Sequence, residues 1–298
     1  MKVMKHIIYS ALLLTFVLSV PISVLAQEEE TPQQEEKKKP RPARDAFESG
    51  EWFDGRTGKV YQKGTLEMVM NHRFGLVNAG RNDLFGIYGP SNIRLAFSYA
   101  PIEKLNVGFG YTKNNLILDL NAKYQILTQT RKNEMPISLT YFGTMGIECK
   151  NEDYANNSDR LTFFNQLILM RRFSSKFSAQ IAPSFSHFNA VFWEQQDDGT
   201  WKHMENDTWG ISAGLRYKVS STFIIMGGYD QPLTQHEINQ PKPSINFGVE
   251  LTTSSHAFQV FVTNYNAIIP QYNFMNNQND FTQGDFLIGF NITRLWSF

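Results

Sequence analysis

The 298-residue chain contains a single cysteine, Cys149. An internal disulfide framework is therefore excluded, and stability must come from backbone pairing and packing. Basic and acidic residues are balanced at 28 each, which argues against a dedicated nucleic-acid binder. After Ala26 no apolar run approaches the roughly 20 residues that a membrane-spanning helix needs. If the protein resides in a membrane, it must do so as a closed β-barrel, the other fold that satisfies its backbone groups in lipid.

The N-terminus has the pattern of a secretory signal peptide over residues 1–26. Lys2 and Lys5 precede an apolar stretch, and Ala26 supplies a small residue at the expected cleavage position. A membrane anchor is the weaker interpretation, because Pro21 interrupts the apolar stretch and a very polar sequence follows it.

Residues 27–63 are expected to form a polar periplasmic tail or leader. Residues 27–45 are charged and nearly free of apolar side chains, so burial cannot offset the entropy of ordering them. The stretch EWFDGRTGKVYQKG (51–64) places three aromatic residues among glycines and charges. We favour a simple leader into the first strand over the alternative, a plug that folds back into a barrel.

From Gly64 onward, apolar residues recur at every second position. In SNIRLAFSYA (91–100), for example, apolar and polar or small residues alternate, and the final DFLIGFNITRLWSF (285–298) does the same. This alternation is the dyad repeat of a transmembrane strand, apolar toward lipid and polar toward the lumen. The predicted fold is an all-β, antiparallel, up-and-down transmembrane barrel of about twelve strands over residues 64–298. Its strands are expected near 65–75, 92–100, 105–113, 116–126, 136–147, 161–172, 177–188, 208–218, 222–230, 244–253, 257–266 and 285–298.

The connections between these segments alternate between short and long, as an outer-membrane barrel requires, except that Asn114–Asn115 is short where a longer loop is allowed. The short ones are expected to be periplasmic turns, which puts both termini in the periplasm. We therefore expect residence in the cell outer membrane of a Gram-negative organism.

Outward-facing aromatic residues gather at both ends of the predicted strands. Amphipathic rings favour the membrane–water interface, so this pattern predicts contact with outer-membrane lipid. A soluble sandwich or lipocalin-like barrel needs neither twelve strands nor two aromatic belts. At the periplasmic end the predicted interface aromatics are Tyr99, Tyr124, Tyr217, Trp296 and Phe298.

Several stretches resemble a family of Gram-negative outer-membrane β-barrels that carries only a domain-of-unknown-function label. They include His72–Gly75, Leu84–Gly86, Ser91–Leu95, VGFGY (107–111) and Asp119 through Lys123 to Gln129. The resemblance implies a barrel in the outer membrane and no established substrate. The terminal Phe298 also resembles the signal by which such barrels are delivered to their insertion machinery.

The predicted lumen face carries charges and glycines. Isolated charges inside a barrel are costly, so these must be hydrated or paired. The candidate lumen residues are Glu67, Arg73, Arg94, Asp119, Lys123, Arg216 and Glu250. Among them, the cations Arg73, Arg94, Lys123 and Arg216 suggest an anion-attracting ladder. Inward glycines, including Gly210 and Gly214, are expected to add space.

An enzyme is not expected. Some outer-membrane barrels hydrolyse lipids with Ser, His and Asn on the lipid-facing wall, but here alternation separates Ser186 from His187 and Asn189. No pair of histidines has metal-ligand spacing, so we expect no metal and no cofactor. The leading hypothesis is a narrow pore for small polar solutes. The alternatives are a non-conducting structural or partner-docking barrel and, less favoured, a lipid hydrolase.

Overall fold

The computed structural model describes residues 40–150 and 154–298. The expected signal peptide and most of the charged tail lie outside the described residues. Among the described residues, no helix combines the length and the apolar character needed to cross a membrane.

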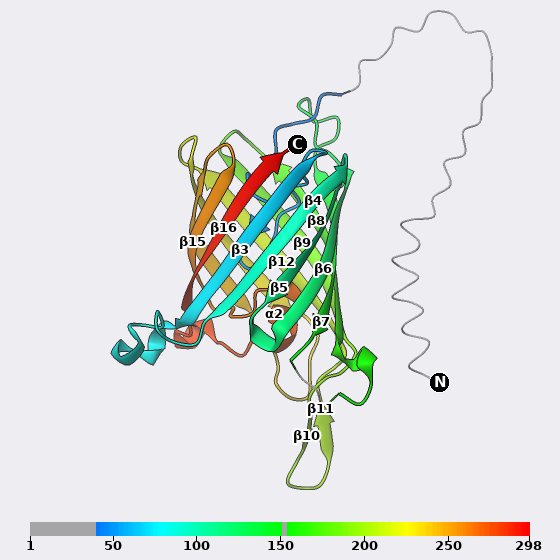
Figure 1. The fold of residues 1–298 in the computed structure, drawn as a ribbon, viewed down its shortest axis with the longest axis vertical. Coiled ribbons are helices and arrows are strands. Elements are labelled where there is room, and N and C mark those ends of the chain that lie inside the picture. The colour runs from blue at the N-terminus through cyan, green and yellow to red at the C-terminus, as the bar shows by residue number, and fades with distance from the viewer. Residues whose placement is uncertain (1–39, 151–153) are drawn as a thin grey trace, which may run out of the picture. The chain divides into compact units, whose positions relative to one another are not determined.

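Twelve antiparallel strands form one closed barrel, in which each strand pairs with its neighbours in the sequence and β16 pairs with β3 to close the ring (Figure 1). The predicted fold class and strand number are confirmed. The barrel strands are β3 (Thr65–Leu76), β4 (Asn92–Ile102), β5 (Leu105–Thr112), β6 (Ile117–Leu127), β7 (Ser138–Glu148), β8 (Leu161–Arg172), β9 (Phe177–Phe188), β12 (Asp207–Lys218), β13 (Phe223–Pro232), β14 (Ser244–Thr252), β15 (His256–Thr263) and β16 (Leu287–Ser297).

Burial alternates along the strands as the sequence pattern predicts. Every second residue of β3 is buried, beginning with Thr65. The register places polar residues of neighbouring strands side by side on the inner face, as in the pair Asn71 and Asn291. Apolar residues such as Phe247 and Leu215 are exposed on the outer face. The inner face is therefore a polar wall, and its side chains must find partners inside the barrel.

The two ends of the barrel differ. At the first, called here the terminal end, residue 64 lies beside Phe298, and the connections between strands are two to ten residues long: 103–104, 128–137, 173–176, 219–222 and 253–255. The opposite loop end carries the connections 77–91, 113–116, 149–160, 189–206, 233–243 and 264–286. In Figure 1 the terminal end is at the top.

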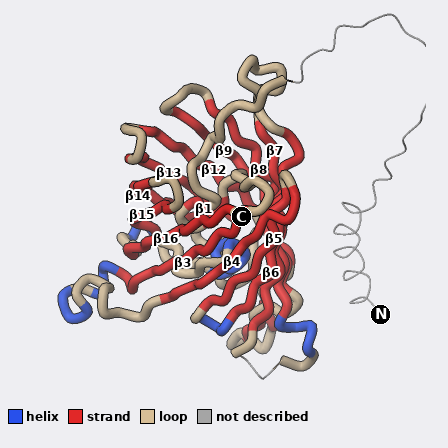
Figure 2. The backbone as a smooth tube through the Cα atoms, turned by 45° about the horizontal axis from the view of Figure 1, so that its top comes forward, coloured by secondary structure: helices blue, strands red, loops and turns tan. Residues whose placement is uncertain are grey.

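Three features do not follow from the strand pattern. A hairpin of β10 (Trp193–Gln195) and β11 (Trp201–His203) extends beyond the loop end. A second hairpin of β1 (Glu51–Trp52) and β2 (Gly55–Arg56) lies inside the ring of barrel strands (Figure 2). The short helix α2 (Pro270–Asn276) is also buried within the ring, against β8, β9, β12 and β13.

Candidate functional site in the barrel lumen

Residues 40–63, the N-terminal plug, enter the lumen at the terminal end. The backbone N–H of Ala43 donates to the carbonyl of Gln129 at 2.7 Å, and the N–H of Arg131 donates to the carbonyl of Arg41 at 3.0 Å. From Ala46 to Tyr61 the chain is mostly buried. It leaves the lumen at Gly64, whose N–H donates to the carbonyl of Ala100 at the same end. The favoured interpretation of 51–64 as a leader is therefore wrong, because this stretch forms part of a plug.

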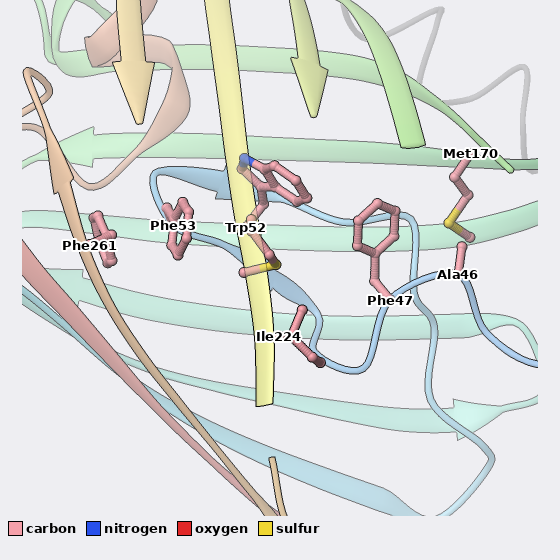
Figure 3. Close-up of a cluster of buried hydrophobic side chains, with 8 residues drawn as sticks. Ala46, Phe47, Trp52, Phe53, Met170, Ile224 and Phe261 are labelled. Atoms are coloured by element: carbon pink, nitrogen blue, oxygen red, sulfur yellow. The ribbon is translucent and has the colours of Figure 1, made fainter. Parts of the chain in front are cut away.

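An apolar cluster anchors the N-terminal plug to the wall (Figure 3). Phe53 stacks on Phe261 of β15 with ring centroids 4.5 Å apart. Trp52 occupies a slot over two inward glycines, since a Cβ at Gly214 would lie 2.6 Å from Trp52 Cζ2 and one at Gly228 would lie 2.7 Å from Trp52 Nε1. These glycines accommodate a plug side chain, and the space that the sequence predicted at Gly214 is filled.

Polar side chains of the wall satisfy the irregular backbone of the plug. The Asn291 amide and the Arg73 guanidinium both donate to the carbonyl of Phe53, at 2.9 and 2.8 Å. Gln259 donates to the carbonyl of Glu51 at 3.1 Å, and Gln180 donates to that of Arg56 at 3.0 Å. Backbone without regular pairing is tolerated at membrane depth only where protein or water supplies such partners. The wall therefore fits this segment in detail.

Buried ion pairs join the plug to the wall or lie beside it. Arg73 Nε donates to Asp54 at 3.0 Å, and both side chains are at most 1% exposed. Arg94 makes a two-pronged contact with Asp119 at 2.8 and 2.7 Å. Within the plug, Arg56 donates to Glu51 at 2.6 Å. Such pairs stabilise only when both partners are present, because a single buried charge costs several kcal/mol.

Nearer the terminal end, Glu48 of the plug accepts hydrogen bonds from Arg216 and Lys218 of β12, each at 2.7 Å. Partial burial alone would raise the pKa of the Glu48 carboxyl. The Lys218 hydrogen bond and the charges of Arg216 and Lys218 outweigh that effect, and they hold this pKa below its usual value.

The loop end of the lumen is filled by residues 264–279, the inserted loop, which contains α2. Its Phe274 stacks near Phe164 with ring centroids 6.0 Å apart and lies against Gly210, where a Cβ would be 2.4 Å from the ring. Asn264 and Asn279 close the neck of the loop, since each side-chain amide donates to the other residue's carbonyl, at 2.8 and 2.9 Å. A second apolar cluster holds the rest of the loop. It consists of Ile117, Phe188, Met204, Ile269, Tyr272 and Met275.

All seven predicted lumen residues lie on the inner face and are buried. Glu67 accepts from the Tyr61 hydroxyl of the plug at 2.8 Å, Lys123 donates to the carbonyl of Gly50 at 2.7 Å, and Glu250 accepts from Gln259 at 2.7 Å. Their role in lining a pore stays a prediction. The anion-attracting ladder is wrong, because Arg73, Arg94 and Arg216 are paired with carboxylates and Lys123 is bonded to the plug.

A small cavity lies between the N-terminal plug and the wall, bordered by Glu51, Arg56, Glu67 and Lys123. Its volume of about 20 Å³ has room for roughly one water molecule. The lumen in this structure is a packed and ion-paired interior.

The predicted interface aromatics lie on the outer wall at the terminal end. The register places Tyr99 and Trp296 on either side of Leu66, and it pairs Tyr217 with Phe177. Tyr124 and Phe298 are exposed at the same end. Their contact with lipid stays a prediction.

The residues considered for lipid hydrolysis are separated as the alternation predicts. Ser186 is buried on the inner face, whereas the His187 ring lies between Asp207 and Asn189. Ser255 and His256 are within hydrogen-bond distance at 3.2 Å, but both are contacted by Arg294 Nη1, at 2.8 Å to Ser255 Oγ and at 3.1 and 2.8 Å to the two ring nitrogens. The Arg294 cation opposes protonation of the His256 ring, and Ser186 faces away from His187. Neither pair therefore has the geometry of a nucleophile activated by a histidine.

The sequence is matched from residue 47 to residue 296 by the family described as "Membrane bound beta barrel domain (DUF5777)". The chain belongs to this family. The match confirms the expected resemblance and establishes a membrane-bound β-barrel. No curated protein matches the sequence.

Solved barrels are similar in fold at low sequence identity. The NanC porin is 9% identical, with a TM-score of 0.47 over 78% of this chain and 99% of that one. An outer-membrane channel of Pseudomonas putida F1 is 12% identical, with a TM-score of 0.47 over 80% of this chain and 97% of that one. The KdgM porin is 9% identical, with a TM-score of 0.42 over 78% and 99% of the two chains.

The sequence reasoning missed the plug residues Glu48, Glu51, Asp54 and Arg56 and the whole inserted loop. One signal was present in the sequence. Inward glycines on several strands require large side chains opposite them if the lumen is packed. The aromatic pair Trp52–Phe53 in an otherwise polar segment supplies such side chains.

Proposed function

We propose that this protein is an outer-membrane barrel closed by its own chain, which serves as a non-conducting structural or partner-docking element. The terminal end faces the periplasm and the loop end faces outward. Short turns on the periplasmic side and longer loops outside are the usual arrangement of bacterial outer-membrane barrels. The connections at the two ends follow it except for the short loop-end connection 113–116.

The observation that carries the proposal is that two separate segments of the chain fill the lumen. The N-terminal plug fills it from the terminal end as far as Asp54, which is bonded to Arg73 of β3 and to Thr263 at the loop end of β15. The inserted loop fills the loop end beside β8, β9, β12 and β13 through apolar packing. A solute would have to displace both, which disfavours the narrow passive pore considered from the sequence.

The loop end supports a docking role. Trp193 and Trp201 on the β10–β11 hairpin are 55% and 59% exposed, and Phe192 precedes them. Exposed tryptophans on a protruding hairpin are suited to contact another protein, since aromatic residues dominate the binding energy of protein interfaces.

Planar-bilayer conductance of the refolded mature chain, residues 27–298, tests the proposal. Gel mobility before and after boiling establishes that the barrel is folded. We expect silence from the wild-type chain and from Asp54→Ala or Phe274→Ala alone, because one filling remains in each. The double variant should show discrete openings, whereas Trp209→Ala on the lipid-facing wall should stay silent. Steady openings of the folded wild-type barrel would reject the proposal.

A further inference from the structure

A basic cleft lies at the terminal end, outside the lumen and beside the point where the N-terminal plug enters. Its volume is about 400 Å³. Its walls come from the plug, from the β6–β7 connection and from the end of β8. The lining residues are Ala43, Arg44, Gln129, Thr130, Arg131, Asn133, Arg171, Arg172, Phe173 and Ser174.

Four arginines line the cleft, and they differ from the arginines of the lumen. Within residues 40–150 and 154–298, no carboxylate lies within 4 Å of the guanidinium groups of Arg44, Arg131, Arg171 or Arg172. Asp45, the nearest acid in sequence, is instead 3.3 Å from Lys59. The cleft therefore concentrates positive charge that the described chain does not neutralise.

Arg171 is placed at the height of the predicted aromatic belt. Alternation along β8 points Met170 inward and Arg171 outward. The Arg171 guanidinium carbon lies 5.2 Å from the centre of the Phe173 ring, and Phe173 in turn packs against Phe177 at 5.5 Å. Its Nε is buried without a hydrogen-bond acceptor among the described residues. A guanidinium held at this level is oriented toward headgroup oxygens.

Below the belt the wall is apolar. Leu167, Ile181 and Leu215 are exposed on the outer face of β8, β9 and β12. A ligand that fits both regions has an anionic head for the cleft and hydrocarbon for the wall. Guanidinium groups bind phosphate by paired hydrogen bonds.

We propose that this cleft binds the phosphate headgroup of an anionic phospholipid of the periplasmic leaflet. The orientation, and hence the leaflet, rests on the proposed function. Because the lining includes Ala43 and Arg44 of the N-terminal plug as well as Arg131 and Arg171 of the barrel, the bound headgroup also bridges the plug and the barrel wall. Arg131 already ties the two together, since its Nε donates to the carbonyl of Pro42 at 3.2 Å.

Native mass spectrometry of the refolded chain in detergent tests the site, with dioleoylphosphatidylglycerol, dioleoylphosphatidylcholine and inorganic phosphate as probes. We expect one phosphatidylglycerol to bind at a concentration about tenfold below that needed for phosphatidylcholine, since basic residues near the membrane surface attract anionic headgroups. Inorganic phosphate should not displace the lipid. Arg131→Ala combined with Arg171→Ala should bring the ratio of the two lipids close to one.

The matched control is Arg81→Ala combined with Lys202→Ala, which removes two exposed cations at the loop end and should leave the preference intact. If the double variant does not fold, the single variants Arg131→Gln and Arg171→Gln replace it, and each should lower the preference for phosphatidylglycerol. No preference for the anionic lipid, equal loss in the control, or displacement by phosphate would overturn the proposal.

Conductance of the same samples separates this inference from the proposed function. A wild-type barrel that conducts but retains the lipid preference rejects the proposed function alone. A silent barrel without lipid preference rejects the lipid site alone.

Discussion

The two segments that fill the lumen are held in place by different kinds of interaction. The N-terminal plug is fixed by ion pairs and by wall side chains that bond its backbone, and only one of its ends, at Gly64, continues into the barrel. The inserted loop is fixed by apolar contacts around Phe274 and Tyr272, and both its ends continue into strands, β15 and β16. The first filling depends on charge and has a route out of the lumen. The second depends on packing and is covalently tethered on both sides.

The largest effect is expected from removing one partner of the deepest ion pair. Asp54→Ala leaves Arg73 buried without its carboxylate, which should weaken the docking of the N-terminal plug by about 3–5 kcal/mol. The measurement is the rate at which trypsin cleaves the plug in the folded barrel. Asp45→Ala removes an exposed partner of Lys59 and should change docking by only about 0–1 kcal/mol. If trypsin cleaved the plug at the same rate in Asp54→Ala and Asp45→Ala, the buried ion pair would not be what holds the plug.

The inserted loop should respond to loss of volume. Phe274→Ala removes a ring packed against Phe164 and should cost about 3 kcal/mol of barrel stability. The midpoint of urea unfolding, followed by gel mobility, measures this change, and it should be nearly independent of salt. Phe247→Ala on the exposed outer wall is the control. Trypsin should cleave the N-terminal plug no faster in Phe274→Ala, and faster cleavage would show that the two fillings are coupled.

An intermediate effect should follow from closing the slot for Trp52. Gly214→Val places side-chain atoms where the indole ring lies, and overpacking of this kind costs about 1–3 kcal/mol. Trp52 should become accessible to a water-soluble fluorescence quencher. Gly227→Val, in which the new side chain has ordinary contacts on the outer face, should leave the quenching unchanged.

The smallest effect concerns pH. Because the pKa of Glu48 is lowered in the folded state, its contribution to docking is fully present above the unfolded pKa and is lost as pH falls through the folded value. Tryptic protection of the plug cannot be read in acid, so pepsin cleavage between pH 5 and pH 3 is the measurement. Wild type should lose protection as pH falls, by about 1 kcal/mol. The plug of Glu48→Gln should be less protected at pH 5 and should lose less protection by pH 3. If the protection of the two proteins fell equally with pH, Glu48 would not be the group responsible.

The barrel could be predicted from the sequence because its strands obey a single repeated constraint. Each strand presents apolar residues outward and polar residues to the lumen, so the alternation is visible in the local sequence. It predicts a strand at 65–75, where β3 spans Thr65–Leu76.

The contacts of the two filling segments could not be predicted, because no such local constraint applies to them. Glu51, Asp54 and Arg56 have the composition of a solvated tail, and what makes their burial favourable is a set of partners on distant strands, such as Arg73 and Gln180. The inserted loop was equally hidden, since PQYNFMN (270–276) is short and carries no periodic face. A residue's partners across the lumen depend on barrel register, which is not a property of either segment alone.

The route of the N-terminal plug has a mechanical consequence. It enters beside Gln129 and leaves at Gly64, and both points are at the terminal end. Tension on the chain ahead of residue 40 would load the bridge between Pro42 and Thr130 first, then the Glu48 bonds, and only afterwards the pair of Asp54 with Arg73. These contacts would break one after another and not all at once. The force needed to extract the plug would be set by the strongest single contact. The extracted segment would stay covalently attached to β3 at Gly64, so it could re-enter the lumen when the tension ends.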